Sequence, residues 1–238
     1  ILENYPQSEY EGDAVALVCS NRSEFAVVRF ATHRAGLRLT PINWHLAPED
    51  IRYIVENAEA KALFLDTRVA AVAPGCAQIP ALRLRVAIGG ELPDYTGWAD
   101  ALAGMDGSDI PDPSLGGTML YTSGTTGRPK GVFRPPLEPA HAAQLQQMLT
   151  AVFQFDPESG KDRALATGPL YHTGPFALCF TTPLTAGIGA VIMDKWEPER
   201  MLALIAQHRI THTFCVPTMF NRLLQLPDDV RARHDVSS

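Results

Sequence analysis

Short apolar segments alternate with helical segments along most of this 238-residue chain, and no other feature constrains the fold more strongly. Residues 14–19 form an apolar run typical of a buried strand, and a mostly apolar helix is expected at 23–35. Pro48 suits the first turn of the next helix. Further strands are predicted at 62–65, 84–88, 118–121, 164–167, 190–193 and 213–216, and further helices near 140–153 and around Met201, Leu204 and Ile205. Such alternation favours an α/β fold of mostly parallel sheets flanked by helices.

A run rich in glycine and hydroxyl side chains follows the predicted strand that ends at Tyr121. Residues 121–131 hold four Ser or Thr hydroxyls, three glycines and Lys130. Glycine lets backbone N–H groups approach an anion, hydroxyls add donors, and the lysine adds positive charge. The spacing fits neither a Walker A loop nor GxGxxG, and a solvated linker is the alternative interpretation. Because the run lies directly behind a buried strand, we favour a polyphosphate-binding loop at the end of a sheet.

Residues 121–132, YTSGTTGRPKGV, resemble the phosphate-loop signature of the adenylate-forming superfamily, which includes acyl-CoA synthetases, adenylation domains of peptide synthetases and luciferases. Other segments resemble the large N-terminal domain of that family in the same order, namely 12–17, 35–36, 41–43, 46–66 and 169–174. The similarity covers most of the chain, and its character is closest to fatty-acid-type CoA ligases.

The resemblance implies an activity and a set of site residues. The family activates a carboxylic acid with ATP and Mg²⁺ to give an acyl-adenylate and pyrophosphate, then transfers the acyl group to coenzyme A. By this resemblance, the residues that hold the ATP phosphates are Thr122, Ser123, Gly124, Thr125, Thr126, Gly127 and Lys130. The acyl and adenylate pocket is expected at Tyr171, His172, Thr173 and Gly174, with His172 as the catalytic-site residue. The resemblance places no metal ligand in this chain.

The resemblance also implies an incomplete N-terminal domain of two αβ subdomains. We expect the first at 1–133, ending in the phosphate loop at 118–131, and the second at 134–238, with the loop in the crevice between them. The family's adenine-binding strand, its Mg²⁺-binding Glu and its small C-terminal domain have no counterpart here. Mg²⁺ and coenzyme A are therefore expected to bind mainly elsewhere, and the 238-residue chain alone is not expected to complete a turnover. The family often has a hydroxyl and a His after the loop, whereas Pro135 and Pro136 here predict an extended connection.

Two kinds of alternative stay open. Within the superfamily, the acyl group could pass to a carrier protein, or the acid could be an amino acid. Outside it, the chain could be a non-catalytic nucleotide-binding module.

Composition and charge limit which partners and which cellular compartment we expect for the protein. The net charge of -6 and the pI near 5.6 give no electrostatic footprint for nucleic acid. The four cysteines are too irregularly spaced for a metal knuckle, and reduced thiols in a cytoplasm are expected. The uncharged stretch 176–193 is interrupted by Pro183 and two glycines, so we expect a buried helix, a turn and a strand rather than a transmembrane segment.

Overall fold

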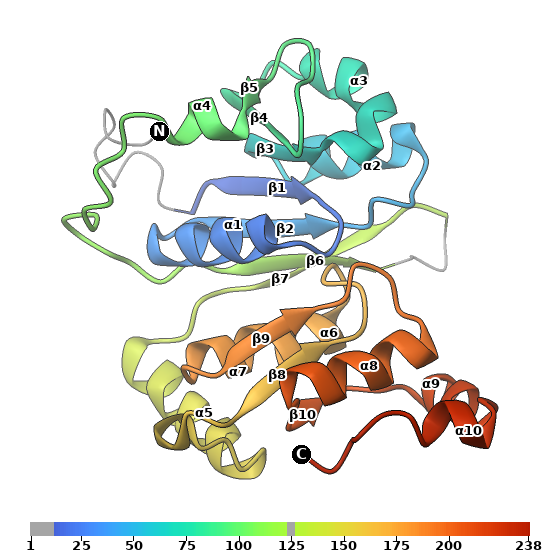
Figure 1. The fold of residues 1–238 in the computed structure, drawn as a ribbon. Helices are drawn as coiled ribbons and strands as arrows, with labels where there is room; N and C mark the ends of the chain where they lie inside the picture. Colours follow the sequence, from blue (N-terminus) through green and yellow to red (C-terminus); the bar gives the residue numbers. More distant parts are fainter. Residues whose placement is uncertain (1–11, 123–126) are drawn as a thin grey trace. The chain divides into compact units, whose positions relative to one another are not determined.

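The computed structural model describes residues 12–122 and 127–238 (Figure 1). Contacts divide the chain into two compact units, Ile1–Leu137 and Glu138–Ser238. Both have the predicted α/β architecture, and each is described below by itself.

The first unit is built on a seven-stranded sheet in the order β5-β4-β3-β1-β2-β6-β7. The strands are β1 (Ala14–Val18), β2 (Arg38–Ile42), β3 (Ala60–Asp66), β4 (Leu84–Ile88), β5 (Thr96–Gly97), β6 (Thr118–Thr122) and β7 (Lys130–Arg134). All neighbouring pairs are parallel except β6 and β7, which are antiparallel. The extended connection predicted after the phosphate loop is thus confirmed, and it is a strand of the sheet.

Both faces of this sheet are covered, which explains why β1 reads as a continuous apolar run. Ala14, Ala16 and Val18 of β1 belong to a core cluster with side chains of α2 and α3. Val15 and Leu17 are equally buried, and alternate strand residues point to opposite faces. The helical elements of this unit are α1 (Ser23–Arg34), α2 (Pro48–Asn57), the 3₁₀ helix at Thr67–Val72, α3 (Ala73–Ala77) and α4 (Trp98–Leu102).

Helix α2 forms as its sequence predicts. Pro48 occupies the first turn, and Glu49 and Asp50 favour the positive end of the helix dipole. Ile51, Ile54 and Val55 lie on one helical face and are buried in the core cluster. Because this face is packed into the core, the remaining face of α2 is held in a fixed position as well.

The second unit contains a three-stranded parallel sheet in the order β10-β8-β9. Its strands are β8 (Arg163–Ala166), β9 (Gly189–Ile192) and β10 (His212–Thr213). Its helical elements are α5 (Pro139–Val152), the 3₁₀ helix Pro157–Ser159, α6 (Thr173–Phe176), the π-helix Ala177–Thr181, α7 (Thr182–Thr185), α8 (Pro198–His208), α9 (Pro217–Leu224) and α10 (Asp228–Arg231). Leu165, Met201 and Leu204 join in the core between the sheet and α8.

One predicted strand is wrong in its extent. The sequence analysis placed a strand at 213–216, whereas β10 ends at Thr213 and Val216 is already the N-cap residue of α9. Pro217 explains the difference, because proline suits the first helical position and provides no N–H for a strand ladder. The uncharged stretch at 176–193 is helical, then turns into β9, as predicted. Within 12–122 and 127–238, no helix combines the length and apolarity needed to cross a membrane.

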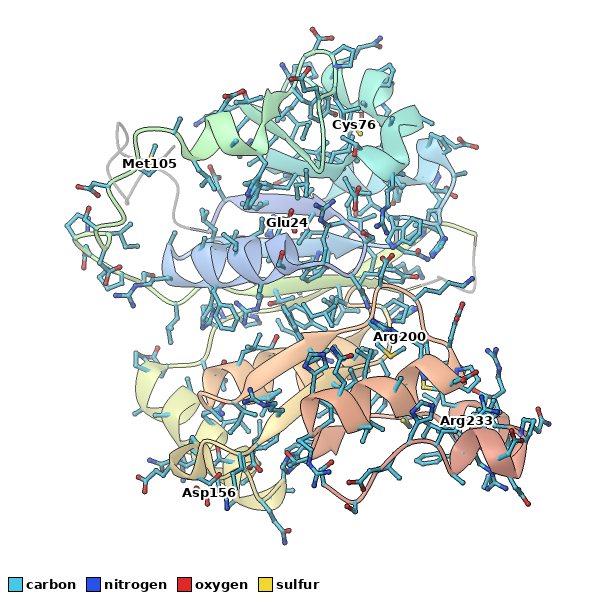
Figure 2. The ribbon with its side chains drawn as sticks, viewed as in Figure 1. Glu24, Cys76, Met105, Asp156, Arg200 and Arg233 are labelled. Carbon is cyan, nitrogen blue, oxygen red and sulfur yellow. The ribbon has the colours of Figure 1, made fainter. Side chains whose placement is uncertain are left out.

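Two of the side chains labelled in Figure 2 belong to helices of the first unit. Glu24, labelled there, lies in the first turn of α1 and accepts hydrogen bonds from the Arg22 guanidinium. Cys76, also labelled, is a buried free thiol of α3 in the core cluster. Burial raises the pKa of this thiol to about 11, so it packs as an apolar group.

Candidate functional site

The predicted phosphate loop connects the end of β6 to the start of β7. In the register of that hairpin, Thr122 at the end of β6 is opposite Lys130 at the start of β7. The Thr122 hydroxyl approaches the Lys130 carbonyl oxygen at 3.5 Å, and both residues are exposed. Thr122 and Lys130 are thus neighbours across the two strands where they join the loop, a place called the mouth of the hairpin from here on. Four residues of the predicted phosphate-binding set, Ser123, Gly124, Thr125 and Thr126, lie outside the described residues.

Two glycines have a steric reason to be in this hairpin. Gly127 has φ +101°, a backbone conformation that residues with a Cβ atom rarely adopt. Gly131 lies under the side chains of Met119 and Tyr121, and an added Cβ would collide with the Met119 methyl group. The glycines that suggested phosphate binding therefore also shape the hairpin itself.

Helix α2 contacts strand β6 and the segment just before β7, which the sequence analysis missed. The Tyr121 hydroxyl donates a 2.7 Å hydrogen bond to Asn57 Oδ1. The Arg128 guanidinium lies over the Tyr53 ring, 4.9 Å from its centroid. Tyr53 and Asn57 are spaced i, i+4, so they lie on one helical face, but no local pattern connects that face to the loop.

The second predicted group, Tyr171 to Gly174, lies after β8 in the other unit. The His172 backbone N–H donates to the Pro169 carbonyl at 3.0 Å, and His172 is the N-cap residue of α6. The ring centroids of Tyr171 and His172 are 4.7 Å apart with a 56° interplanar angle. Tyr171 is buried, while His172 and Thr173 are exposed.

The backbone around His172 is held by close packing against two glycines. A Cβ on Gly174 would lie 3.1 Å from the Phe214 ring, and one on Gly168 would lie 2.5 Å from Pro175 Cγ. Thr167 is buried, and its hydroxyl donates a 2.5 Å hydrogen bond to the Phe214 carbonyl. The end of β8 and the segment after β10 thereby fix the loop that carries His172.

The surroundings of Tyr171 and His172 set their protonation. Although the His172 side chain is exposed, partial desolvation by its neighbours lowers its pKa below the ordinary value, so the imidazole is neutral at pH 7. A neutral imidazole offers one donor and one acceptor nitrogen. Burial also raises the pKa of Tyr171, which therefore keeps its proton.

The structure brings the predicted residues together in two groups, one in each unit. Thr122, Gly127 and Lys130 gather at the hairpin, and Tyr171 to Gly174 gather after β8. In the described part of the chain, no group of three His, Cys, Asp or Glu residues could hold a metal ion.

Comparisons with known proteins place this geometry in a family. Residues 10–238 match the family described as AMP-binding enzyme. The chain is 32% identical over 226 residues to indoleacetate–CoA ligase of Aromatoleum aromaticum, covering 90% of this chain and 41% of that relative. It is 28% identical over 225 residues to long-chain-fatty-acid–CoA ligase FadD13 of Mycobacterium tuberculosis, covering 92% of this chain and 42% of the relative.

Solved structures agree with the fold. The crystal structure of ATP-bound MatB from Rhodopseudomonas palustris superposes with a TM-score of 0.74 at 28% identity, covering 97% of this chain and 44% of that one. The N-terminal domain of FACL13 from M. tuberculosis, bound to an inhibitor, superposes with a TM-score of 0.69 at 21% identity, covering 96% of this chain and 55% of that one. This chain thus spans 41–42% of the length of the two curated relatives named above.

Proposed function

This chain belongs to the family of AMP-binding enzymes, and from that premise we propose that it is part of an AMP-forming acyl-CoA ligase. The proposed reaction joins a carboxylic acid to the α-phosphorus of ATP with release of pyrophosphate, and then transfers the acyl group to the thiol of coenzyme A. Curated relatives named as CoA ligases support this reaction class.

The observation that carries the proposal is the pairing of Thr122 with Lys130 at the mouth of the β6–β7 hairpin. When the acid attacks, negative charge develops on the departing pyrophosphate. An ammonium group and a hydroxyl fixed at one place can stabilise that charge more in the transition state than in bound ATP. We assign this role to Lys130, with Thr122 and Gly127 as further contacts to the β- and γ-phosphates. Ser123, Gly124, Thr125 and Thr126 belong to the same proposed set.

We assign the acid and the adenylate to the second group, with Tyr171, Thr173 and Gly174 as neighbours and His172 as the catalytic-site residue. A neutral His172 can donate a hydrogen bond to a carboxylate or an acyl oxygen without adding a net charge. ATP, Mg²⁺ and coenzyme A are the cofactors of the proposed reaction, and the described residues contain no group of three His, Cys, Asp or Glu residues that could hold the metal ion.

The acid is proposed to be a fatty acid, with an arylacetic acid as the second candidate. FadD13 is named for long-chain fatty acids, and the relative that is 32% identical is named for indoleacetate. Transfer to a carrier protein, activation of an amino acid, and nucleotide binding without catalysis are the rival functions. A cytoplasmic location is part of the proposal, in line with the free cysteines.

Exchange of labelled pyrophosphate into ATP tests the reaction. The assay uses the longest protein that the gene encodes, with fatty, arylacetic and amino acids, each with and without coenzyme A. Exchange with fatty acids, and thioester formation when coenzyme A is added, supports the proposal. Exchange with arylacetic or amino acids alone would reassign the substrate, and exchange without thioester formation would favour a carrier-protein acceptor. ATP binding without exchange for any acid would favour the non-catalytic module. The isolated 238-residue chain is expected to form no acyl-CoA.

A further inference from the structure

The mouth of the β6–β7 hairpin has little support from its own sheet. Strand β6 pairs with β2 only at Thr118, which lies opposite Leu39. Strand β7 is the edge strand, and all of its residues are exposed. Thr122 and Lys130 pair with each other at the far end of the β6–β7 ladder, beyond the residue where β6 pairs with β2, so a contact from another element can restrict their motion further.

Helix α2 provides one such contact to β6. Asn57, the last residue of the helix, accepts a 2.7 Å hydrogen bond from the Tyr121 hydroxyl, next to Thr122 in the chain. Burial, with a smaller contribution from the nearby Tyr53, raises the pKa of Tyr121 to about 12. The phenol therefore keeps its proton and stays a donor throughout the neutral pH range.

The same helix contacts the other side of the hairpin one turn earlier. The Arg128 guanidinium lies 4.9 Å from the centroid of the Tyr53 ring, a distance at which a cation is attracted to an aromatic face. Tyr53 is held in turn, because it is partly buried and packs against the core cluster. Arg128 lies two residues before Lys130, so this contact limits the motion of the second end of the hairpin.

We propose that Tyr53 and Asn57 are positioning residues for the phosphate site. Lying at i and i+4 on one face of α2, they hold the hairpin end that carries the paired Thr122 and Lys130 in a fixed position against the helix. A preorganised site loses less conformational entropy when polyphosphate binds, so the pair lowers the KM for ATP. This inference rests on the proposed function, because it assigns ATP to the hairpin.

The test compares matched variants of α2 in the full-length protein by pyrophosphate exchange. Tyr53→Leu removes the aromatic face, Tyr53→Phe keeps it, and Asn57→Leu removes the acceptor. The control is Glu56→Gln, at the residue before Asn57. This variant loses only the exposed ion pair of Glu56 with Arg52. We expect Tyr53→Leu to raise the KM for ATP about two- to fivefold and Asn57→Leu about two- to tenfold. Tyr53→Phe and Glu56→Gln should stay close to the parent protein, and the KM for the acid should not change.

A double-mutant cycle separates positioning from general loss of stability. If Tyr53 acts through Arg128, the combination Tyr53→Leu with Arg128→Met should raise the KM for ATP no more than the larger single change. An unchanged KM for ATP in both Tyr53→Leu and Asn57→Leu would overturn the inference while leaving the proposed function intact. Equal increases in the KM values for ATP and for the acid would also overturn it.

A second readout keeps the inference testable if the parent protein shows no pyrophosphate exchange, an outcome that would reject the proposed function. Amide hydrogen exchange of residues 127–134 is then measured without ligand. Faster exchange in Tyr53→Leu and Asn57→Leu than in Glu56→Gln would support the role of α2 in holding the hairpin. Equal rates in all three variants would reject that role.

Discussion

The Ser20 hydroxyl donates a 2.7 Å hydrogen bond to the Asp66 carboxylate, joining the ends of two neighbouring parallel strands. The Ser20 backbone N–H donates to the same oxygen, and the Arg68 N–H donates to the other at 3.0 Å. Asp66 is fully buried, with the Arg22 guanidinium 3.7 Å away. A carboxylate suits this place because it accepts at both oxygens.

Replacing Asp66 should therefore weaken the first unit. In Asp66→Asn, one of the two positions facing donors becomes an NH₂ group, which leaves buried donors without an acceptor. We expect the free energy of unfolding to fall by about 1–3 kcal/mol. Urea unfolding measures the change, with the exposed Asp112→Asn as control, expected within about 0.5 kcal/mol of the parent. Equal midpoints for the two variants would show that the Asp66 contacts add no stability.

Two glycine substitutions should change the free energy of unfolding in opposite directions. An added Cβ on Gly116 would collide with the Leu37 carbonyl oxygen and lie 2.7 Å from that of Thr32, and backbone atoms cannot move aside. Gly75 lies inside α3, and its Cβ would meet only the Arg52 side chain at 3.7 Å. We expect Gly116→Ala to lower the free energy of unfolding by about 1–3 kcal/mol and Gly75→Ala to raise it by about 0.5–1 kcal/mol. Thermal and urea unfolding of both variants check the prediction, which fails if the two shifts have the same sign.

The fold was predictable from the sequence where burial leaves a local pattern. Strand β4 has the predicted bounds, and α2 begins at the predicted Pro48, because continuous apolar runs and helical spacing are visible within a few residues. Strand β2 was missed because Pro41 inside it weakens the strand signal. Strand β7 was predicted only as extended chain, since a fully exposed edge strand has no buried face to show.

The candidate site was predictable only in part for a related reason. The residues at the hairpin mouth, Thr122 and Lys130, belong to one contiguous run that shows its chemistry directly. The contact of Tyr53 with Arg128 and that of Gly174 with Phe214 join distant segments. Such contacts depend on the sheet order and on packing, which no local spacing encodes.

Stability should fall as the pH drops from 7 toward 5.5. Burial, aided by the Arg29 guanidinium and opposed by the Gly116 carbonyl, lowers the pKa of His33 below 6.5, and burial lowers that of His172. Below pH 6.5 the unfolded chain therefore binds more protons than the folded one, so acid favours unfolding until the folded pKa values are reached. Carboxylates with lowered pKa values, such as Glu24 and Asp109, titrate at lower pH and should not contribute here.

Urea unfolding at several pH values between 5.5 and 7.5 measures this slope. His33→Gln and His172→Gln should each make it shallower, because each removes one group that takes up a proton on unfolding. Nuclear magnetic resonance of the imidazole protons should place both midpoints below 6.5. A slope that is unchanged in both variants would show that other groups cause the dependence.

Lys130→Met should reduce pyrophosphate exchange more than any other substitution at the hairpin. Methionine keeps much of the length and apolar stem of lysine but removes the positive charge that we propose stabilises the departing pyrophosphate. Loss of one preorganised donor to a developing anion reduces kcat/KM on the order of 100-fold, or about 2.7 kcal/mol at 25 °C. Lys195→Met is the matched control, because its side chain is 84% exposed and its nearest carboxylate partner, Glu197, is 3.9 Å away. If Lys130 acts on the phosphates, the loss should appear with every acid that the enzyme accepts, while binding of the acid itself should change little. Equal rates in Lys130→Met and Lys195→Met would remove Lys130 from the proposed mechanism, because the positive charge is the property that the substitution takes away.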